Sequence, residues 1–230
     1  LSGLVGSEMC IRDSSTTVTH ANSGPRLRTS VARTADALQR DLLHSPNHAK
    51  QAHARAVLAT LRKYSAAKLK DHPLALEEVL LLLEPPLSAR ELEEGGDPSA
   101  AELAVFQALT MLGVHMQSAT TDAHIPGQSF AKACGRFYAQ SQSQSTKPRF
   151  DAMMVAQDEA SRMVHIRSLV TLLRRAKLGF DYGQFANDLR VLSDKKVSQK
   201  EQVRRQGVLL RWGRDFATGV YASTQSESES

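Results

Sequence analysis

The segment from Glu159 to Gly179 constrains the fold most strongly, because its apolar residues recur with the period of an α-helix. Spacings of three and four residues place an apolar stripe about 100° wide on one side of that helix. The stripe consists of Met163, Ile166, Leu169, Val170 and Leu173. We expect this stripe to pack on Trp212 and Phe216, and we expect Gly179 to end the helix in a left-handed conformation.

The other side of the same helix is cationic. Arg167 and Arg174 are seven residues apart, so they lie on one side with roughly 10 Å of helix rise between them. No acidic residue follows Glu159 within the helix. The pattern is typical of a scaffold that holds a polyanion, and the alternative is a core helix whose arginines are merely solvated. The residues that flank this side are Arg162, Arg175 and Lys177.

The rest of the chain also indicates helices. Only 5% of its residues are aromatic, alternating β patterns are scarce, and the low-complexity segment QSQSQSTKP interrupts the helical pattern once. We therefore predict an all-α, two-lobed helical bundle. Its parts are a disordered lead-in (1–30), an N-terminal lobe (31–140), a linker (141–147), a C-terminal lobe (148–222) and a disordered tail (223–230).

Local signals give the expected helix ends. Two capping boxes, Ser99 with Glu102 and Ser198 with Glu201, each predict a helix start, and Asp181 is a further N-cap. His115 lies near the end of the apolar helix after Ser99, and we expect it to be a packed or capping residue rather than a ligand. The expected helices are Val31–His44, His48–Lys70, Pro73–Leu83, the segment AVFQALTMLGVHMQS (104–118) after the Ser99 box, Gln128–Ala139 with Phe130, Cys134, Phe137 and Tyr138 inward, a short one from Arg149, 159–177, 182–192 and 199–221.

The first fourteen residues, LSGLVGSEMCIRDS, carry no helical period and resemble translated sequencing-adapter read-through. Cys10 would go with them, and Cys134 has no partner at ligand spacing, so neither a disulfide nor a zinc site is expected. This cysteine usage fits a reducing cytoplasm. No run of eighteen apolar residues exists, so we expect a soluble protein without a membrane span.

Charge is arranged in three blocks. Residues 26–70, 71–131 and 147–222 carry formal charges of +8, −9 and +7. Such blocks are either solvated faces or the parts of one basic stripe and one acidic docking surface. For the acidic segment from Glu77 to Asp97 we expect contact with solvent or with a basic protein.

Catalytic and metal-binding patterns are missing. The sequence has no Gly-rich phosphate loop, no H-E-x-x-H and no G-x-S-x-G. His44, His48 and His53 straddle Pro46, and capping or ion pairing explains Asp181, Asp188 and Asp215 better than metal binding does. We therefore expect no enzyme activity, no metal and no cofactor.

Five segments between about residues 30 and 222 occur in an order and spacing that match a known family. They are AHARAVLATLRK, AAELAVFQALTMLGVHMQS, KPRFDAMMVA, HIRSLVTLLRRAKLGFDYGQFANDLRVL and RRQGVLLRWGRDFA. In this order and spacing they resemble the CasB family, the small subunit of type I-E CRISPR Cascade complexes. Phe185, the HMQS segment (His115 to Ser118) and the insertion from Lys195 to Gln202 depart from the family pattern.

The resemblance implies a non-catalytic subunit, present in two copies beside other Cascade subunits. Base pairing with the guide RNA would recognise the target sequence. This subunit would bind the backbone of guide RNA and target DNA and stabilise the R-loop. The residues expected to bind nucleic acid are Arg62, Lys63, Arg149, Arg167, Arg174 and Arg175. The alternatives are a free-standing helical nucleic-acid-binding protein or regulator, although no helix-turn-helix pattern is present, and a nuclease.

Overall fold

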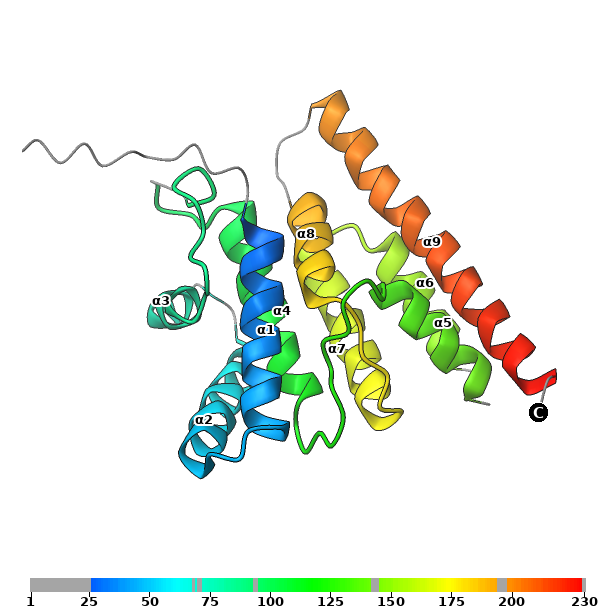
Figure 1. The fold of residues 1–230 in the computed structure, drawn as a ribbon. Coiled ribbons are helices and arrows are strands. Elements are labelled where there is room, and N and C mark those ends of the chain that lie inside the picture. Colours follow the sequence, from blue (N-terminus) through cyan, green and yellow to red (C-terminus); the bar gives the residue numbers. More distant parts are fainter. Residues whose placement is uncertain are drawn as a thin grey trace, which may run out of the picture.

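The computed structural model describes residues 26–67, 69, 72–92, 95–141, 145–193 and 198–228, and most of them lie in helices (Figure 1). Strand-type pairing within these ranges is limited to one isolated bridge between His124 and Phe180. The all-α fold class is confirmed. The helices are α1 (Leu27–Leu43), α2 (His48–Tyr64), α3 (Pro73–Leu81), α4 (Ala100–His115), α5 (Phe130–Gln140), α6 (Thr146–Val155), α7 (Glu159–Arg175), α8 (Tyr182–Ser193) and α9 (Gln199–Ser228).

Helix α4 lies at the centre of the N-terminal half and ends at His115, three residues before the expected end at Ser118. Its capping box is present, since the Glu102 N–H donates to Ser99 Oγ (3.0 Å) and the Ser99 N–H donates to Glu102 Oε2 (2.7 Å). The sequence predicted one buried side, but α4 is buried almost all round, because α1, α2, α3, α7 and α8 pack on it. The sequence of α4 suits burial on all sides, because Glu102 is its only Asp, Glu, Lys or Arg residue.

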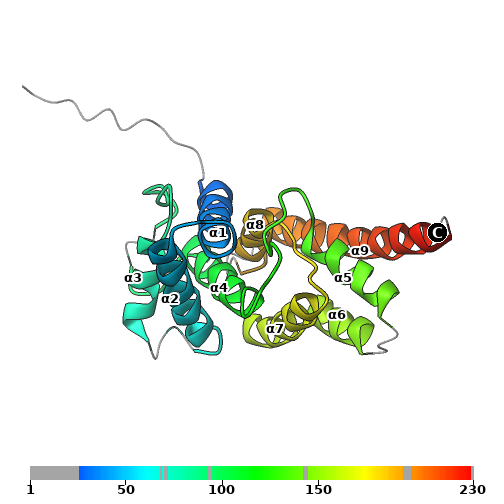
Figure 2. The same ribbon diagram turned by 60° about the horizontal axis from the view of Figure 1, so that its bottom comes forward.

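Packing between helices crosses the predicted linker. Helix α5, which precedes the linker, packs most extensively on α9, while α8, which follows it, packs on α4 and α1. Figure 2 shows α1, α8 and α9 in one layer and α2, α7 and α6 in another. Helix α6 starts at Thr146, three residues before the expected start at Arg149. The division into lobes at 141–147 stays a prediction, and residues 142–144 lie outside the described part.

Two glycines allow the backbones of α5 and α9 to touch. A Cβ added to Gly135 would lie 2.0 Å from the Phe216 carbonyl oxygen, and one added to Gly219 would lie 2.2 Å from that of Lys132. Only a residue without a side chain permits such an approach. The crossing therefore fixes the distance between these two helices.

Helix α9 begins as predicted, since the Glu201 N–H donates to Ser198 Oγ (3.4 Å). Trp212 and Phe216 are 1% and 5% exposed, which confirms that they anchor this helix. The Trp212 indole N–H donates to Asp188 Oδ2 on α8 (2.8 Å). Helix α9 continues past Tyr221 to Ser228, into the expected tail, because no Gly or Pro follows Tyr221 to stop it.

Helix α1 begins earlier than predicted, at Leu27 rather than Val31. The carboxylate of Glu91, in the loop before α4, accepts the Arg26 N–H (3.0 Å) and the Leu27 N–H (2.9 Å). This N-terminal cap comes from a residue 64 positions away. Local sequence could not reveal it. Residues 1–25, which include the fourteen excluded residues and Cys10, lie outside the described part.

Three other helix ends differ from the predictions. Helix α2 ends at Tyr64, where the Ser65 hydroxyl donates to the Arg62 carbonyl (2.7 Å); Lys70, the expected end, lies outside the described residues. Helix α3 ends at Leu81 rather than Leu83. Helix α5 starts two residues late because Ser129 is its N-cap, and Tyr138 on it is not inward but 37% exposed.

Candidate nucleic-acid interface

Helix α7 has the two faces that the sequence predicted. Asp158 caps it, accepting the Ser161 N–H at 2.8 Å. Ile166, Leu169, Val170 and Leu173 are buried, and Met163 is half-buried. The packing partner differs from the prediction, because the stripe lies mainly against α6 and α4 and not against Trp212 and Phe216. Those aromatic side chains pack instead on Phe130 and Phe150, which line α9 from α5 and α6.

The end of α7 also differs from the prediction. Lys177, not Gly179, adopts the left-handed conformation, with φ of 57°. The Lys177 N–H donates to the Arg174 carbonyl (3.1 Å), and the Leu178 N–H donates to that of Leu173 (3.0 Å). Gly179 is needed for another reason, since an added Cβ would lie 2.8 Å from the carbonyl oxygens of Asp122 and Ala123. The glycine lets the loop before α5 lie directly on the chain after α7.

Arg174 binds the end of α4. Its guanidinium donates to the Val114 carbonyl (3.4 Å) and to the side-chain oxygen of Gln117. The Val114 carbonyl belongs to the last turn of α4, where carbonyls lack the donor four residues on, and it also accepts the Gln117 N–H (3.4 Å). Arg174 is therefore a cap as well as a surface cation, a role that sequence spacing did not show.

The same end of α4 lies beside α2. A Cβ added to Gly113 would lie 2.5 Å from the Arg62 backbone nitrogen. The backbone of Arg62 thus lies beside Gly113, and the guanidinium of Arg174 binds the next residue, Val114. Lys63 is exposed next to Arg62. The structure therefore brings Arg174 and the backbone of Arg62 to the same end of α4, although their helices are over a hundred residues apart in the sequence.

The remaining predicted residues lie on α7 and on α6, which packs on α7. Arg167 lies two turns before Arg174 on α7 and is half-buried, while Arg175 is exposed. Arg149 is on α6, which packs on α7, and its guanidinium donates to the Ser145 carbonyl (3.1 Å). Within the described residues, none of the six predicted cations forms an ion pair with a carboxylate. We call this set the α2/α6/α7 surface.

Arg162 is not part of that surface. Its guanidinium donates to the Ala156 carbonyl in the turn between α6 and α7. Burial lowers the pKa of Arg162, and the neighbouring charge of Arg205 lowers it further. The guanidinium of Arg162 is therefore occupied by its hydrogen bond to the turn between α6 and α7.

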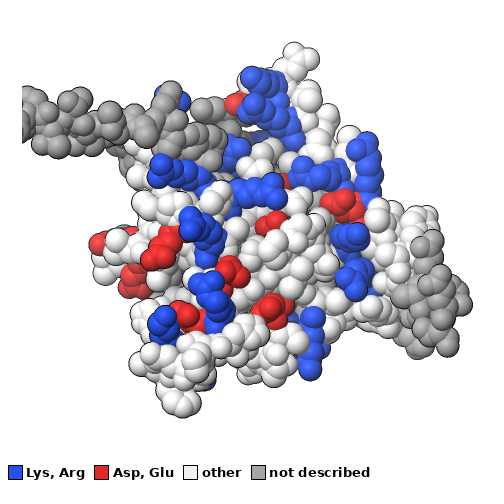
Figure 3. All heavy atoms as spheres, viewed as in Figure 1, with Lys and Arg blue, Asp and Glu red and all other residues white. Residues whose placement is uncertain are grey.

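A second basic surface lies on another side of the molecule. Figure 3 shows Lys and Arg side chains over α1, α8 and α9. Three of these cations are paired, because Arg28 contacts Asp181 (3.4 Å), Arg40 contacts Asp36 (3.0 Å) and Arg211 contacts Asp188. Sequence reasoning did not assign this surface. The signal was present in two further seven-residue spacings, Arg33 with Arg40 and Arg204 with Arg211.

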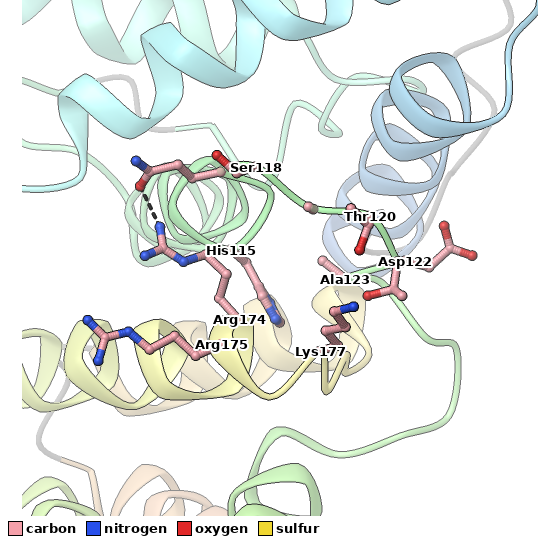
Figure 4. Close-up of a pocket in the computed structure, with 11 residues that line it drawn as sticks. His115, Ser118, Thr120, Asp122, Ala123, Arg174, Arg175 and Lys177 are labelled. Atoms are coloured by element: carbon pink, nitrogen blue, oxygen red, sulfur yellow. Dashed lines mark hydrogen bonds between the residues drawn. The ribbon is translucent and has the colours of Figure 1, made fainter.

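A pocket of about 300 Å³ opens where α4 and α7 end. Figure 4 shows its walls, which are the loop after α4 and the last turn of α7. Lys177 extends toward the loop, whereas Arg175 points away along α7. The lining includes Ser118, Thr120, Thr121 and Asp122 from the loop, Arg174, Arg175 and Lys177 from α7, and His115.

His115 forms the floor between these walls. It is 3% exposed, and its Nδ1 lies 3.0 Å from the Tyr182 hydroxyl. Burial lowers the pKa of His115 to about 4, the Leu178 carbonyl raises it in part, and the Arg174 charge lowers it again. The ring is neutral at pH 7, which confirms the prediction of a packed histidine.

The acidic residues that were considered for metal binding have other roles. Asp181 accepts the Gln184 N–H (2.9 Å), so it caps α8 as predicted, and it also contacts Arg28. Asp188 binds Arg211 and Trp212. Among the described residues, no group of three or more His, Cys, Asp or Glu side chains could hold a metal ion. In the same ranges, no helix combines the length and apolar character that crossing a membrane requires.

The fold and the site define an all-helical protein that presents unpaired basic residues on packed helices. The comparisons with known proteins give the family. The family model described as CRISPR-associated protein Cse2 matches residues 57–216, and the chain therefore belongs to that family. The family resemblance found in the sequence motifs is confirmed.

A solved structure shows a similar fold. The crystal structure of CasB from Thermobifida fusca superposes with a TM-score of 0.62 at 24% identity, over 83% of this chain and 97% of that chain. A comparison with curated protein sequences gives no match.

Proposed function

We propose that this chain is the non-catalytic small subunit of a type I-E CRISPR guide-RNA surveillance complex, and that it binds nucleic-acid backbone to stabilise the R-loop. Its partners are guide RNA, target DNA, the other Cascade subunits and a second copy of itself. Membership of the Cse2 family supports the complex. The α2/α6/α7 surface supports the nucleic-acid contact.

One observation carries the choice of surface. On the α1/α8/α9 side, carboxylates already occupy Arg28, Arg40 and Arg211. On the α2/α6/α7 surface no carboxylate of the described chain pairs with a predicted cation. Phosphate oxygens would supply the missing counter-charge, and bidentate contacts between guanidinium and phosphate are among the stronger hydrogen bonds in proteins.

The chemistry of this surface suits positioning rather than sequence recognition. Arginine and lysine on helix faces hold phosphates, while sequence in such complexes is determined by guide pairing. If about four phosphates of a single strand are neutralised, the logarithm of the association constant should fall against the logarithm of salt concentration with a slope of about −3.

The test is a charge-removing variant of the complex. The double variant Arg167→Gln/Arg175→Gln should assemble normally, weaken R-loop formation about tenfold and reduce the salt slope by about 1.4, which corresponds to two lost phosphate contacts. Arg174 is unsuitable because it also caps α4. The control Lys50→Gln/Arg90→Gln removes the same charge from exposed positions elsewhere. Equal R-loop stability in the two variants would refute the assignment.

The acidic segment from Glu77 to Asp97 is a candidate docking surface for a basic subunit. Glu77, Glu78 and Glu84 are exposed, as this role requires, whereas Glu91 is buried in the cap of α1. Glu93 and Glu94 lie outside the described residues. Replacing Glu77 and Glu84 by Lys should weaken assembly, which size-exclusion chromatography of the reconstituted complex would measure. Intact assembly would rule out docking there.

A further inference from the structure

The pocket between the ends of α4 and α7 has more hydrogen-bond donors than the fold uses. Within the described chain, the hydroxyls of Ser118, Thr120 and Thr121 make no hydrogen bond, and the ammonium of Lys177 forms no ion pair. The only carboxylate in the lining, Asp122, is in contact with His44 Nε2 (2.9 Å). The lining therefore offers the ammonium of Lys177 and three hydroxyls that have no partner in the described chain, while its one carboxylate already has a partner.

The two walls are held rigidly. The Phe180 N–H donates to the Ala123 carbonyl (2.9 Å), and the Ile125 N–H donates to the Phe180 carbonyl (3.1 Å). Ser118 and Lys177, one on each wall, both adopt positive φ, at 55° and 57°. These are left-handed turns in which the chain leaves α4 and α7, as described above for Lys177. The two segments that carry the walls are thus joined by backbone hydrogen bonds beside the pocket.

Two helices end at this pocket, and their last carbonyls would repel an anion. Most of that repulsion is already offset. The guanidinium of Arg174 donates to the Val114 carbonyl of α4, and backbone N–H groups bind the Leu172, Leu173 and Arg174 carbonyls of α7. The charge of Lys177 is not needed for either cap, so it is available to a ligand.

We propose that this pocket binds one phosphate group of a nucleic-acid strand, through the ammonium of Lys177 and the hydroxyls of Thr120 and Thr121. The inference deepens the function proposed above, because a strand that follows Arg167 and Arg174 along α7 reaches the pocket at the end of the helix. The pocket volume of about 300 Å³ exceeds a phosphate and is at the lower limit of small-molecule sites, which leaves room for part of a sugar. Ser118 and Arg174 complete the wall.

Strand binding by the full-length chain tests the assignment. Fluorescence anisotropy with a labelled single-stranded oligonucleotide should show that Lys177→Gln lowers affinity about tenfold, the usual loss for one charge-assisted hydrogen bond. The double variant Thr120→Val/Thr121→Val should lower affinity without any change in charge. Lys50→Gln is the matched control, since it removes one exposed lysine far from the pocket in sequence and should change affinity less than twofold.

Inorganic phosphate separates the two possible sources of the ligand. Titrated into ¹⁵N-labelled protein, it should shift the amide signals of Thr120 and Thr121 in a saturable manner, and the strand should displace it. If phosphate binds but Lys177→Gln leaves strand affinity equal to that of the control, the pocket is a free-anion site and the proposal is wrong. No phosphate shift together with unaltered strand affinity would also overturn it.

Failure of the broader function gives a different pattern. If the wild-type chain and complex bind no strand while phosphate still shifts the loop signals, the nucleic-acid function fails, and with it the proposed strand contact. If Arg167→Gln/Arg175→Gln weakens strand binding but the pocket variants do not, only the pocket proposal fails. Urea unfolding of Lys177→Gln checks that any loss of binding is not a loss of folding.

Discussion

The crossing of α5 and α9 can be tested with one substitution at two positions of the same helix. A Cβ at Gly219 would lie 2.2 Å from the Lys132 carbonyl oxygen and 2.9 Å from the Arg136 backbone nitrogen, whereas nothing lies within 4 Å of a Cβ at Gly207. Gly219→Ala should therefore destabilise the protein, and Gly207→Ala should stabilise it.

The magnitudes follow from the distances. Ordinary van der Waals contact begins at 3.4 Å, so the helices must separate by about 1.2 Å to accommodate the Gly219→Ala methyl group. Backbone atoms cannot rotate away, so we take the upper part of the range of about 1–3 kcal/mol that overpacking costs. Alanine regains about 1 kcal/mol of helix propensity at either position. The net expectation is a loss of about 2 kcal/mol for Gly219→Ala and a gain of about 1 kcal/mol for Gly207→Ala.

Urea denaturation followed by circular dichroism measures both variants. With the m-value unchanged, the two midpoints should move in opposite directions from wild type. Equal shifts for the two variants would show that propensity alone governs α9 and that the close approach of α5 is not a real constraint.

Three further predictions concern buried polar groups. Glu91→Gln should lower stability by about 2 kcal/mol at neutral pH, because it removes a charged acceptor at the start of α1. Burial alone would raise the pKa of Glu91, but hydrogen bonds from Arg26, Ser88 and Leu27 lower it overall. The stability that Glu91 contributes is therefore present above the usual carboxyl pKa and is lost as pH falls through the lower folded pKa. Urea titrations of wild type and variant should converge at that low pH. His115 has a folded pKa of about 4, below its unfolded value, so the unfolded chain binds the proton first as pH falls. The free energy of unfolding should therefore drop by about 3 kcal/mol between pH 6.5 and 4. His115→Phe should lack this pH-dependent loss, and a variant with the same pH profile as wild type would contradict the argument. Asp188→Ala should cost about 3 kcal/mol, since it leaves the Trp212 N–H and Arg211 without their acceptor, and an unshifted urea midpoint would exclude that role.

Local signals predicted the helices and several of their starts. The capping boxes at Ser99 and Ser198 and the cap at Asp181 involve residues three positions apart, so the sequence contains the whole interaction. Ends set by distant residues were missed. The start of α1 depends on Glu91, and the place of Gly179 depends on the loop at Asp122 and Ala123.

The candidate site also combines features that local sequence predicts with features that only helix packing decides. The seven-residue spacing of Arg167 and Arg174 predicted that they share a side of α7, because helix geometry alone decides this. That Arg174 caps α4, that Arg62 lies beside the same turn, and that Lys177 faces the loop of Thr120 and Thr121 depend on how α2, α4 and α7 pack.

The sequence by itself determined the helical class, the two-faced character of α7 and the family motifs, because periodicity and caps act over a few residues. Tertiary structure alone decided which basic residues have free charge, since ion pairs such as Arg28 with Asp181 join residues far apart in the chain. It also decided where α7 packs. Side-chain shape and glycine contacts between helices select that arrangement, and neither is encoded in the period of a single helix.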